Sequence, residues 1–214
     1  MPQKNSLLLI VLILLIVSIS IPVIVTEIEK IQANMNAELI QKDKDTPKQN
    51  NSVIIVYSRS STTLILAQYI AEEIGASVYQ LKAPAYELGL LGWSNAMIDA
   101  RNHTAIISPK TIDLTPYEVI YLGSPIWLYS PAPPIWAFAK ENNFTDKHVV
   151  LFNTYNSKFE QSYIDKFEAL VSLRGAVSFK HQHIRRGRIG QQVAVEKMVQ
   201  KFKQTYLSNS MEKY

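Results

Sequence analysis

The sequence has no cysteine among its 214 residues. This absence excludes a disulfide framework, a zinc site with thiolate ligands, an iron–sulfur cluster held by cysteines and a cysteine nucleophile. Histidine and glycine are also scarce, with four and seven copies. A histidine metal centre and a fold that needs many glycine turns are therefore disfavoured.

Charged residues are absent from Asn5 to Thr26, and the stretch 7–25 consists almost entirely of Leu, Ile and Val. As a helix, these residues would reach about 28 Å, close to the thickness of the hydrocarbon core of a bilayer. A buried core helix would normally show a polar face, and a cleaved signal peptide would have a shorter apolar part and a small-residue cleavage site. We therefore predict an uncleaved transmembrane signal anchor over 1–26, with membrane contact through 7–25.

The charges that flank the apolar stretch predict its orientation. Lys4 precedes it, whereas Glu27, Glu29 and Lys30 follow it. Positive residues favour the cytoplasmic side. We expect a single-pass protein of the inner (cytoplasmic) membrane with its globular domain on the extracytoplasmic side.

The rest of the chain divides by composition. Residues 27–51 are expected to form a polar stalk, in which 27–40 could continue the helix, whereas 41–51 include Pro47 and have no apolar face. The globular domain is predicted over 52–209.

Apolar runs alternate with segments of helical periodicity through this domain. Strands are predicted at 53–57, 77–81, 117–122, 148–153 and 176–184, and helices at 63–74, 93–101, 135–140, 161–173 and 193–207. Such alternation is typical of an α/β fold, with a parallel sheet covered by helices on both faces. Ligands of such sheets bind at the carboxyl ends of the strands, so the loops there are the candidate site.

The loop after the first strand, 58–63, is rich in hydroxyl groups and leads into a helix. Backbone N–H groups and hydroxyls at a helix N-terminus favour a phosphate. The loop lacks the glycines of a dinucleotide fingerprint and the Gly-Lys-Ser/Thr end of a P-loop. An ordinary capped loop is the alternative.

The loop after the third strand, 123–134, holds Trp127 and Tyr129 between prolines. Rigid aromatic side chains in a ligand loop can stack on a planar ring. The alternative is that Trp127 packs against the core.

Three stretches resemble the flavodoxin family. Residues 53–63 are similar to its first strand and phosphate loop (Y-S-x-T-G-N-T), and 117–127 to its motif Y-D-x-I-x-x-G-x-P-I-W. Residues 149–157 resemble the stretch that borders the pyrimidine end of the flavin. The resemblance covers nearly all of 52–207. It implies a flavodoxin-like five-stranded parallel sheet of order 2-1-3-4-5 that binds flavin mononucleotide (FMN) non-covalently.

The resemblance also implies the residues that bind this cofactor. The phosphate would be held by Ser58, Ser60, Thr62 and Thr63, and by the backbone of Arg59 and Ser61. The flavin ring would lie against Ser124, Pro125, Ile126, Trp127 and Leu128, with Trp127 stacking on it, and against Thr154, Tyr155 and Asn156 at its other edge. No catalytic side chain and no metal are needed, because the cofactor carries the redox chemistry.

Two positions depart from the family pattern. Ser61 stands where the loop has glycine, and Tyr155-Asn156 where a glycine pair is usual. We therefore expect a membrane-anchored flavodoxin-like protein, either an electron carrier or an FMN-dependent oxidoreductase. A flavin-free binding or scaffold domain of the same fold is the alternative. A membrane quinone and a redox protein are both open as electron partners.

The last 45 residues are basic, with nine Lys or Arg against Glu196 and Glu212, a balance of 9 − 2 = +7. This surface suits anionic lipid headgroups or an anionic substrate, and a solvated helix face is the alternative. No nucleic-acid partner is expected, because no aromatic-bearing binding module surrounds these residues. His181 and His183 alternate on a strand, and we interpret them as a structural pair because no third metal ligand is in view.

Overall fold

The computed structural model describes residues 2–40, 51–188 and 190–207. Five parallel strands form the sheet, in the order β2-β1-β3-β5-β6, and a short sixth strand pairs antiparallel with β3. The strands are β1 (Ser52–Val56), β2 (Ser77–Gln80), β3 (Val119–Trp127), β4 (Ser130–Pro131), β5 (His148–Tyr155) and β6 (Ser178–Arg185). Without β4, this is the predicted order 2-1-3-4-5, so the predicted fold class is confirmed.

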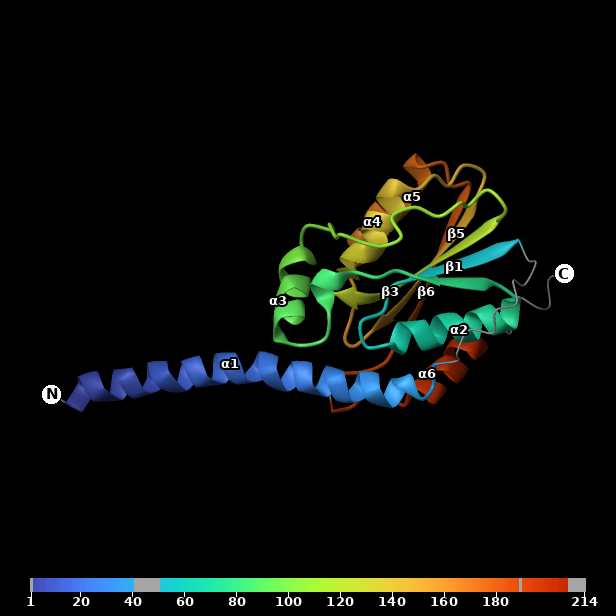
Figure 1. Cartoon of the computed structure of the whole chain (residues 1–214). Coiled ribbons are helices and arrows are strands. Elements are labelled where there is room, and N and C mark those ends of the chain that lie inside the picture. The colour runs from blue at the N-terminus through green and yellow to red at the C-terminus, as the bar shows by residue number, and fades with distance from the viewer. Residues whose placement is uncertain (1, 41–50, 189, 208–214) are drawn as a thin grey trace.

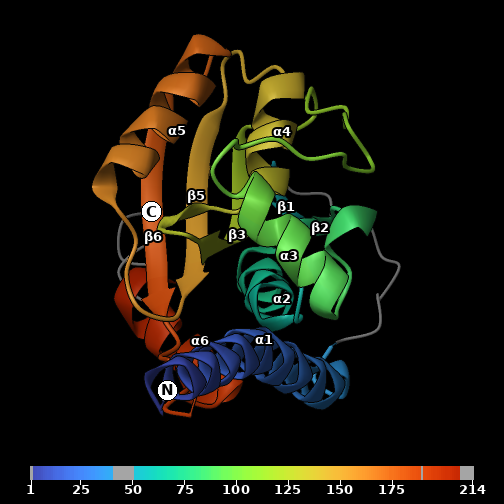
Figure 2. The same cartoon turned by 90° about the vertical axis from the view of Figure 1, so that its left-hand side faces the viewer.

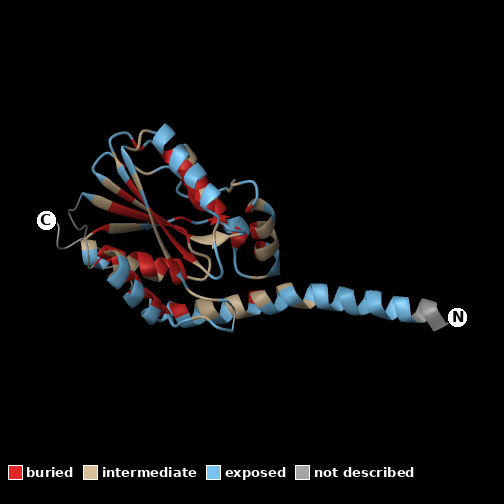
Figure 3. Cartoon of the chain, turned by 180° about the vertical axis from the view of Figure 1, so that it is seen from behind, coloured by how far each residue is buried: buried red, intermediate tan, exposed pale blue. Residues whose placement is uncertain are grey.

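Helices cover both faces of the sheet (Figure 1). They are α2 (Thr62–Ile74), the 3-10 turn η1 (Pro84–Tyr86), α3 (Leu90–Asp99), α4 (Pro133–Glu141), α5 (Gln161–Leu173), α6 (Val195–Phe202) and the terminal π-turn η2 (Lys203–Leu207). One hydrophobic core lies under α3, α4 and α5, and a second lies under α2 and α6. Figure 3 shows the buried residues along the sheet and on the helix faces turned toward it.

The central strand β1 shows why a parallel sheet forms here. Its β-branched residues 53–56 are all completely buried. Val53 and Ile55 point into the core under α4 and α5, and Ile54 and Val56 point into the core under α2 and α6. A continuous apolar run is needed because both faces of the strand are covered.

The third strand is longer than predicted. We expected it to end at residue 122 and to be followed by a loop over 123–134, but β3 continues to Trp127. Pro125 is still in register with Thr154 of β5, and Ile126 and Trp127 pair with β4. This added pairing satisfies backbone groups that would otherwise lie in a loop.

The helix α1 spans Pro2–Ala37 and is continuous through Pro22. Every side chain from 6 to 19 is exposed, and the helix is long and apolar enough to cross a membrane. It continues beyond residue 26 into the first part of the predicted stalk, where the sequence allowed a helix. Residues 27–37 continue the helix and pack along α2 and α3, so this part of the predicted stalk is structured. Residues 41–50 and the domain end at 208–209 lie outside the described residues.

The chain runs out along α1 and returns along β1 in the opposite direction (Figure 1). Because the long strands are parallel to β1, their carboxyl ends all lie at the end of the domain from which the apolar half of α1 projects. The carboxyl ends of the strands, where the candidate site is expected, and the apolar half of α1 therefore lie at the same end of the molecule.

Candidate functional site

A cavity of about 240 Å³ lies at the carboxyl ends of the strands. Twelve of the fourteen residues predicted to bind the cofactor line this cavity. These are Ser58, Arg59, Ser60, Thr62, Thr63, Pro125, Ile126, Trp127, Leu128, Thr154, Tyr155 and Asn156. The remaining lining residues come from elements that the sequence analysis did not assign to the site, namely Val25, Ile28, Glu29, Gln32, Trp93, Ala96, Met97, Arg186 and Gln192.

The last residue of the first loop has a left-handed backbone conformation. Ser61 precedes α2 with φ 64° and ψ −6°, and its side chain makes no capping hydrogen bond. Such a φ normally selects glycine, and serine adopts it at a cost. The Thr63 N–H donates to Ser58 Oγ at 3.2 Å. The hydroxyls of Thr63 and Thr154 lie 2.7 Å apart, which ties the loop to β5.

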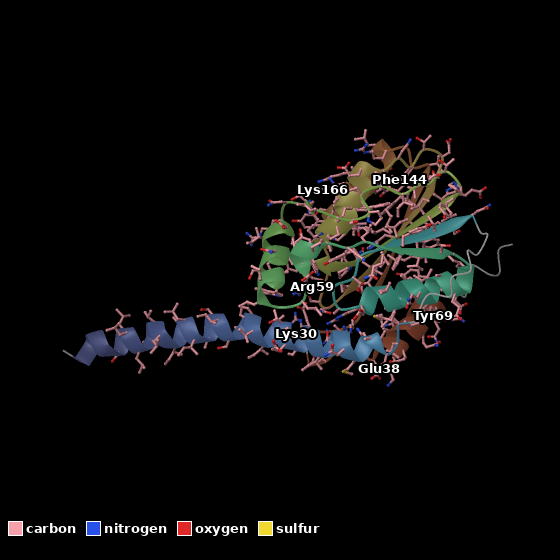
Figure 4. The ribbon with its side chains drawn as sticks, viewed as in Figure 1. Lys30, Glu38, Arg59, Tyr69, Phe144 and Lys166 are labelled. Atoms are coloured by element: carbon pink, nitrogen blue, oxygen red, sulfur yellow. The ribbon has the colours of Figure 1, made fainter. Side chains whose placement is uncertain are left out.

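The second half of α1, from Val25 to Asn36, forms one wall of the cavity. Glu29 forms an ion pair with Arg59, whose side chain lies between α1 and the segment that leads into α3 (Figure 4). Arg59 Nε donates to the carbonyl oxygen of Tyr86 at 3.1 Å, and Asn36 Nδ2 donates to that of Ser60 at 2.6 Å. The wall thus rests on both the loop after β1 and the segment before α3.

These wall residues have a signal in the sequence that the analysis did not use. Val25, Ile28 or Glu29, Gln32 and Asn36 recur three or four residues apart, which places them on one helix face. The stripe continues past the end of the apolar span. The expected continuation of the helix through 27–40 therefore has a packed face as well as an exposed one.

Arg186 follows β6 and places a half-buried positive charge beside the first loop. Its Nη1 donates to Thr62 Oγ1 at 2.7 Å and to Gln32 Oε1 at 3.2 Å. Its Nε is buried and has no hydrogen-bond partner. In the described part of the chain no carboxylate forms an ion pair with it. Burial lowers the pKa of Arg186, but a guanidinium keeps its charge at neutral pH.

Trp127 is a half-buried wall of the cavity. Its ring meets Tyr57 edge to face at 5.6 Å and Tyr86 at 5.5 Å. Burial raises the pKa of Tyr57, so this aromatic group is uncharged. The indole therefore both packs against the core and lines the cavity, and its stacking on a flavin stays a prediction.

A tight turn after Trp127 shapes the same wall. Leu128 and Tyr129 have φ of 43° and 73°, and they join the paired residues Trp127 and Ser130. Two positive φ values in a two-residue hairpin are typical of a type I′ turn, which usually takes Asn or Gly.

Two of the predicted residues do not line the cavity. Ser61 supplies the backbone conformation described above. Ser124 is fully buried, and its carbonyl oxygen and hydroxyl accept hydrogen bonds from Asn153 Nδ2 at 2.9 and 3.1 Å. Its role is therefore to support the strand behind the cavity.

The two histidines of β6 lie behind the cavity. His181 Nε2 lies 2.9 Å from Asn153 Oδ1, so the pair extends the network that holds Ser124. Burial, and secondarily His183, lowers the pKa of His181 to about 4. The part of the chain that the structure describes contains no group of three His, Cys, Asp or Glu side chains placed to hold a metal ion.

The sequence and the fold both match known proteins. The model of a family described as flavodoxin matches residues 51–201. A candidate flavoprotein from Bacteroides uniformis is 21% identical, with a TM-score of 0.59 over 73% of this chain and 99% of its own. A Lactobacillus acidophilus flavoprotein solved in complex with FMN is 21% identical, with a TM-score of 0.51 over 62% of this chain and 93% of its own.

A third solved structure, a candidate flavoprotein from Bacteroides eggerthii, is 16% identical, with a TM-score of 0.52 over 73% of this chain and 98% of its own. No curated protein matches the sequence. The family match covers the whole sheet and the loops at its carboxyl ends. The chain therefore belongs to the flavodoxin family.

Proposed function

We propose that this protein binds FMN non-covalently in the cavity at the carboxyl ends of the strands and takes part in electron transfer. The observation that carries the proposal is Arg186, a half-buried cation with a buried, unpaired Nε, which bonds to the first loop and whose described hydrogen-bond partners are all neutral. Burying a charge without an opposite charge is costly. An anionic ligand in the cavity would remove that cost.

The end of the cavity near Arg186 fits a phosphate. Hydroxyls of Ser58, Thr62 and Thr63 surround the N-terminus of α2, where backbone N–H groups and the helix dipole favour an anion. A guanidinium adds charge-assisted hydrogen bonds to phosphate oxygens. We propose these hydroxyls, N–H groups and the guanidinium as the donors to the phosphate of FMN.

The other end of the cavity fits a flat ring. Met97, Ile126 and Trp127 supply apolar surface there, and Tyr155 lines the side formed by β5. An aromatic wall with polar backbone nearby is typical of sites for planar ligands. When bound, the flavin would supply the redox chemistry, and the side chains of this cavity would bind and orient it.

We further propose that α1 anchors the protein in the membrane through residues 7–25. The support is the length and apolar composition of a helix whose side chains from 6 to 19 are all exposed. The inner membrane and an extracytoplasmic domain stay proposals, which rest on the charges around the span.

A flavin-free domain is a second candidate, and one contact favours it. The Thr62 hydroxyl already accepts hydrogen bonds from Asn36 at 3.2 Å and from Arg186 at 2.7 Å. These two side chains occupy one of the groups expected to bind the phosphate. In that case α1 would itself fill the role of the ligand at this loop.

Titration separates the two functions. The full chain in detergent is titrated with FMN, while flavin and tryptophan fluorescence are followed. Binding with quenching is expected, and the Trp127→Ala variant should bind about fivefold or more weakly, since aromatic pairs contribute on the order of 1 kcal/mol beyond burial. Lys201→Ala, on an exposed helix position, serves as the control. Absence of quenching at high micromolar FMN would support the flavin-free domain.

A further inference from the structure

The helix α3 and the turn before it expose apolar side chains. Leu91 is 77% exposed and Ile98 is 65% exposed, and Leu88 and Leu90 are exposed as well. Residues 91 and 98 are seven apart, so they lie on the same face of α3. Gly92 and Ala96, on the other face, are buried against the domain. The outward face of α3 is thus more apolar than a surface helix of a water-soluble domain usually is.

This helix lies at the end of the domain that faces the apolar half of α1. Figure 2 looks at that end, with the N-terminal part of α1 toward the viewer and α3 in front of the sheet. In Figure 1, α3 lies at the left edge of the domain, directly above the point where α1 leaves it. α3 therefore lies at the end of the domain nearest the region that a membrane around α1 would occupy.

The length of the free part of α1 sets how far the domain stands from that membrane. Ser20 and Pro22 are the first residues of α1 that are partly shielded, and everything from 6 to 19 is exposed. Residues 7–19 span only about 20 Å, whereas a hydrocarbon core is about 30 Å thick. To immerse the whole apolar stretch 7–25, the bilayer must also surround the turns of α1 beside the domain.

We propose that the face formed by α3 and the carboxyl ends of the strands is a lipid-contacting surface. Leu91 and Ile98 then lie in the interface of the bilayer, and the cofactor cavity opens at the membrane surface, since Val25 and Trp93 both line it. The inference rests on the proposed anchoring by α1. This placement favours a lipid-soluble electron carrier over a soluble redox protein as the partner of the cavity.

The absence of native cysteine allows a direct test, because each introduced cysteine is the only thiol. The full chain carrying Leu91→Cys or Ile98→Cys is labelled with an environment-sensitive fluorophore and reconstituted in phosphatidylcholine vesicles. Quenching is measured with lipids that carry a spin label on the acyl chain near the headgroup. The matched control is Leu173→Cys, because this apolar residue is 85% exposed. It ends α5 just before the amino end of β6, away from the carboxyl ends of the strands.

We expect labels at 91 and 98 to be quenched several-fold more than the label at 173. Leu12→Cys, within the apolar stretch, reports on the anchor itself. If position 12 is quenched but 91 and 98 behave like 173, the anchor holds and the lipid-contacting surface is wrong. That result would point to a protein partner on α3. If position 12 is not quenched, the anchoring fails and the inference fails with it.

Discussion

At the scale of single residues, Arg186 distinguishes a phosphate ligand from an uncharged one. Its guanidinium reaches Thr62 at the first loop, whereas the neighbouring Arg185 is exposed and donates to the Asn156 carbonyl oxygen at 3.5 Å. A charge-assisted hydrogen bond contributes about 1.5–3 kcal/mol, which corresponds to roughly 10- to 100-fold in affinity. We predict that Arg186→Gln weakens FMN binding by this factor and leaves riboflavin binding nearly unchanged.

Fluorescence titration with the two flavins measures this difference, and Arg185→Gln provides the control. The control variant should bind both flavins like the wild type. An equal loss for FMN and riboflavin in Arg186→Gln would show that the arginine supports the loop and does not contact the phosphate.

His181 makes the stability of the domain depend on pH. Its pKa is about 4 in the folded state and about 6.5 when unfolded. Between these values the unfolded chain binds more protons, so stability should fall as the pH drops from about 6.5 to about 4. The contribution of this residue is on the order of 3 kcal/mol, because each pKa unit corresponds to about 1.4 kcal/mol.

Thermal melts of the detergent-solubilised chain across this pH range measure the effect. His181→Gln removes the titrating group, so its melting temperature should fall less than that of the wild type as the pH drops. Parallel curves for the two proteins would contradict the burial of a neutral His181.

At the scale of elements, the start of α2 contains a strained residue. Ser61 has a left-handed backbone, and its side chain caps nothing. Glycine adopts this conformation without the steric cost, which is about 1–2 kcal/mol for other residues. We predict that Ser61→Gly raises the free energy of unfolding by roughly 1 kcal/mol.

Thermal or chemical unfolding of the variant measures this change in the free energy of unfolding. The matched control is Ser60→Gly, one residue away. Ser60 does not have a positive φ, so the Ser60→Gly substitution should not raise the free energy of unfolding. A destabilised Ser61→Gly variant would mean that the serine hydroxyl makes a contact that outweighs the strain.

The elements also show what the sequence could predict. Residues 53–56 are buried on both faces, and an uninterrupted apolar run of this kind identifies a strand from composition alone. The two ligand loops were found for the same reason, since each directly follows such a strand. The fold and most of the predicted cavity residues therefore depend on local patterns.

The remainder depends on contacts that local patterns do not encode. The hairpin at 128–129 was missed because Leu and Tyr are unusual in a type I′ turn. The α1 wall was missed because its contacts join segments far apart in the chain, such as Glu29 with Arg59 and Gln32 with Arg186. The spacing of the wall residues marks one face of the helix, but it does not indicate which surface of the domain that face packs on.

At the scale of the whole molecule, the anchor and its orientation decide where the cofactor would work. Lys4 before the span and Glu27 after it predict an extracytoplasmic domain. Protease added to spheroplasts should therefore digest the domain, while a cytoplasmic marker stays intact. Protection of both proteins would reverse the predicted orientation.

The central claim is that this flavodoxin-family chain holds FMN in a cavity bounded by its ligand loops, Arg186 and the wall formed by the second half of α1. The most direct test is the visible absorption spectrum of the full chain, incubated with FMN and then freed of unbound cofactor by gel filtration. We predict that the protein fraction carries the bands of oxidised flavin at one FMN per chain. A protein fraction without flavin absorption would contradict the claim and favour the flavin-free domain.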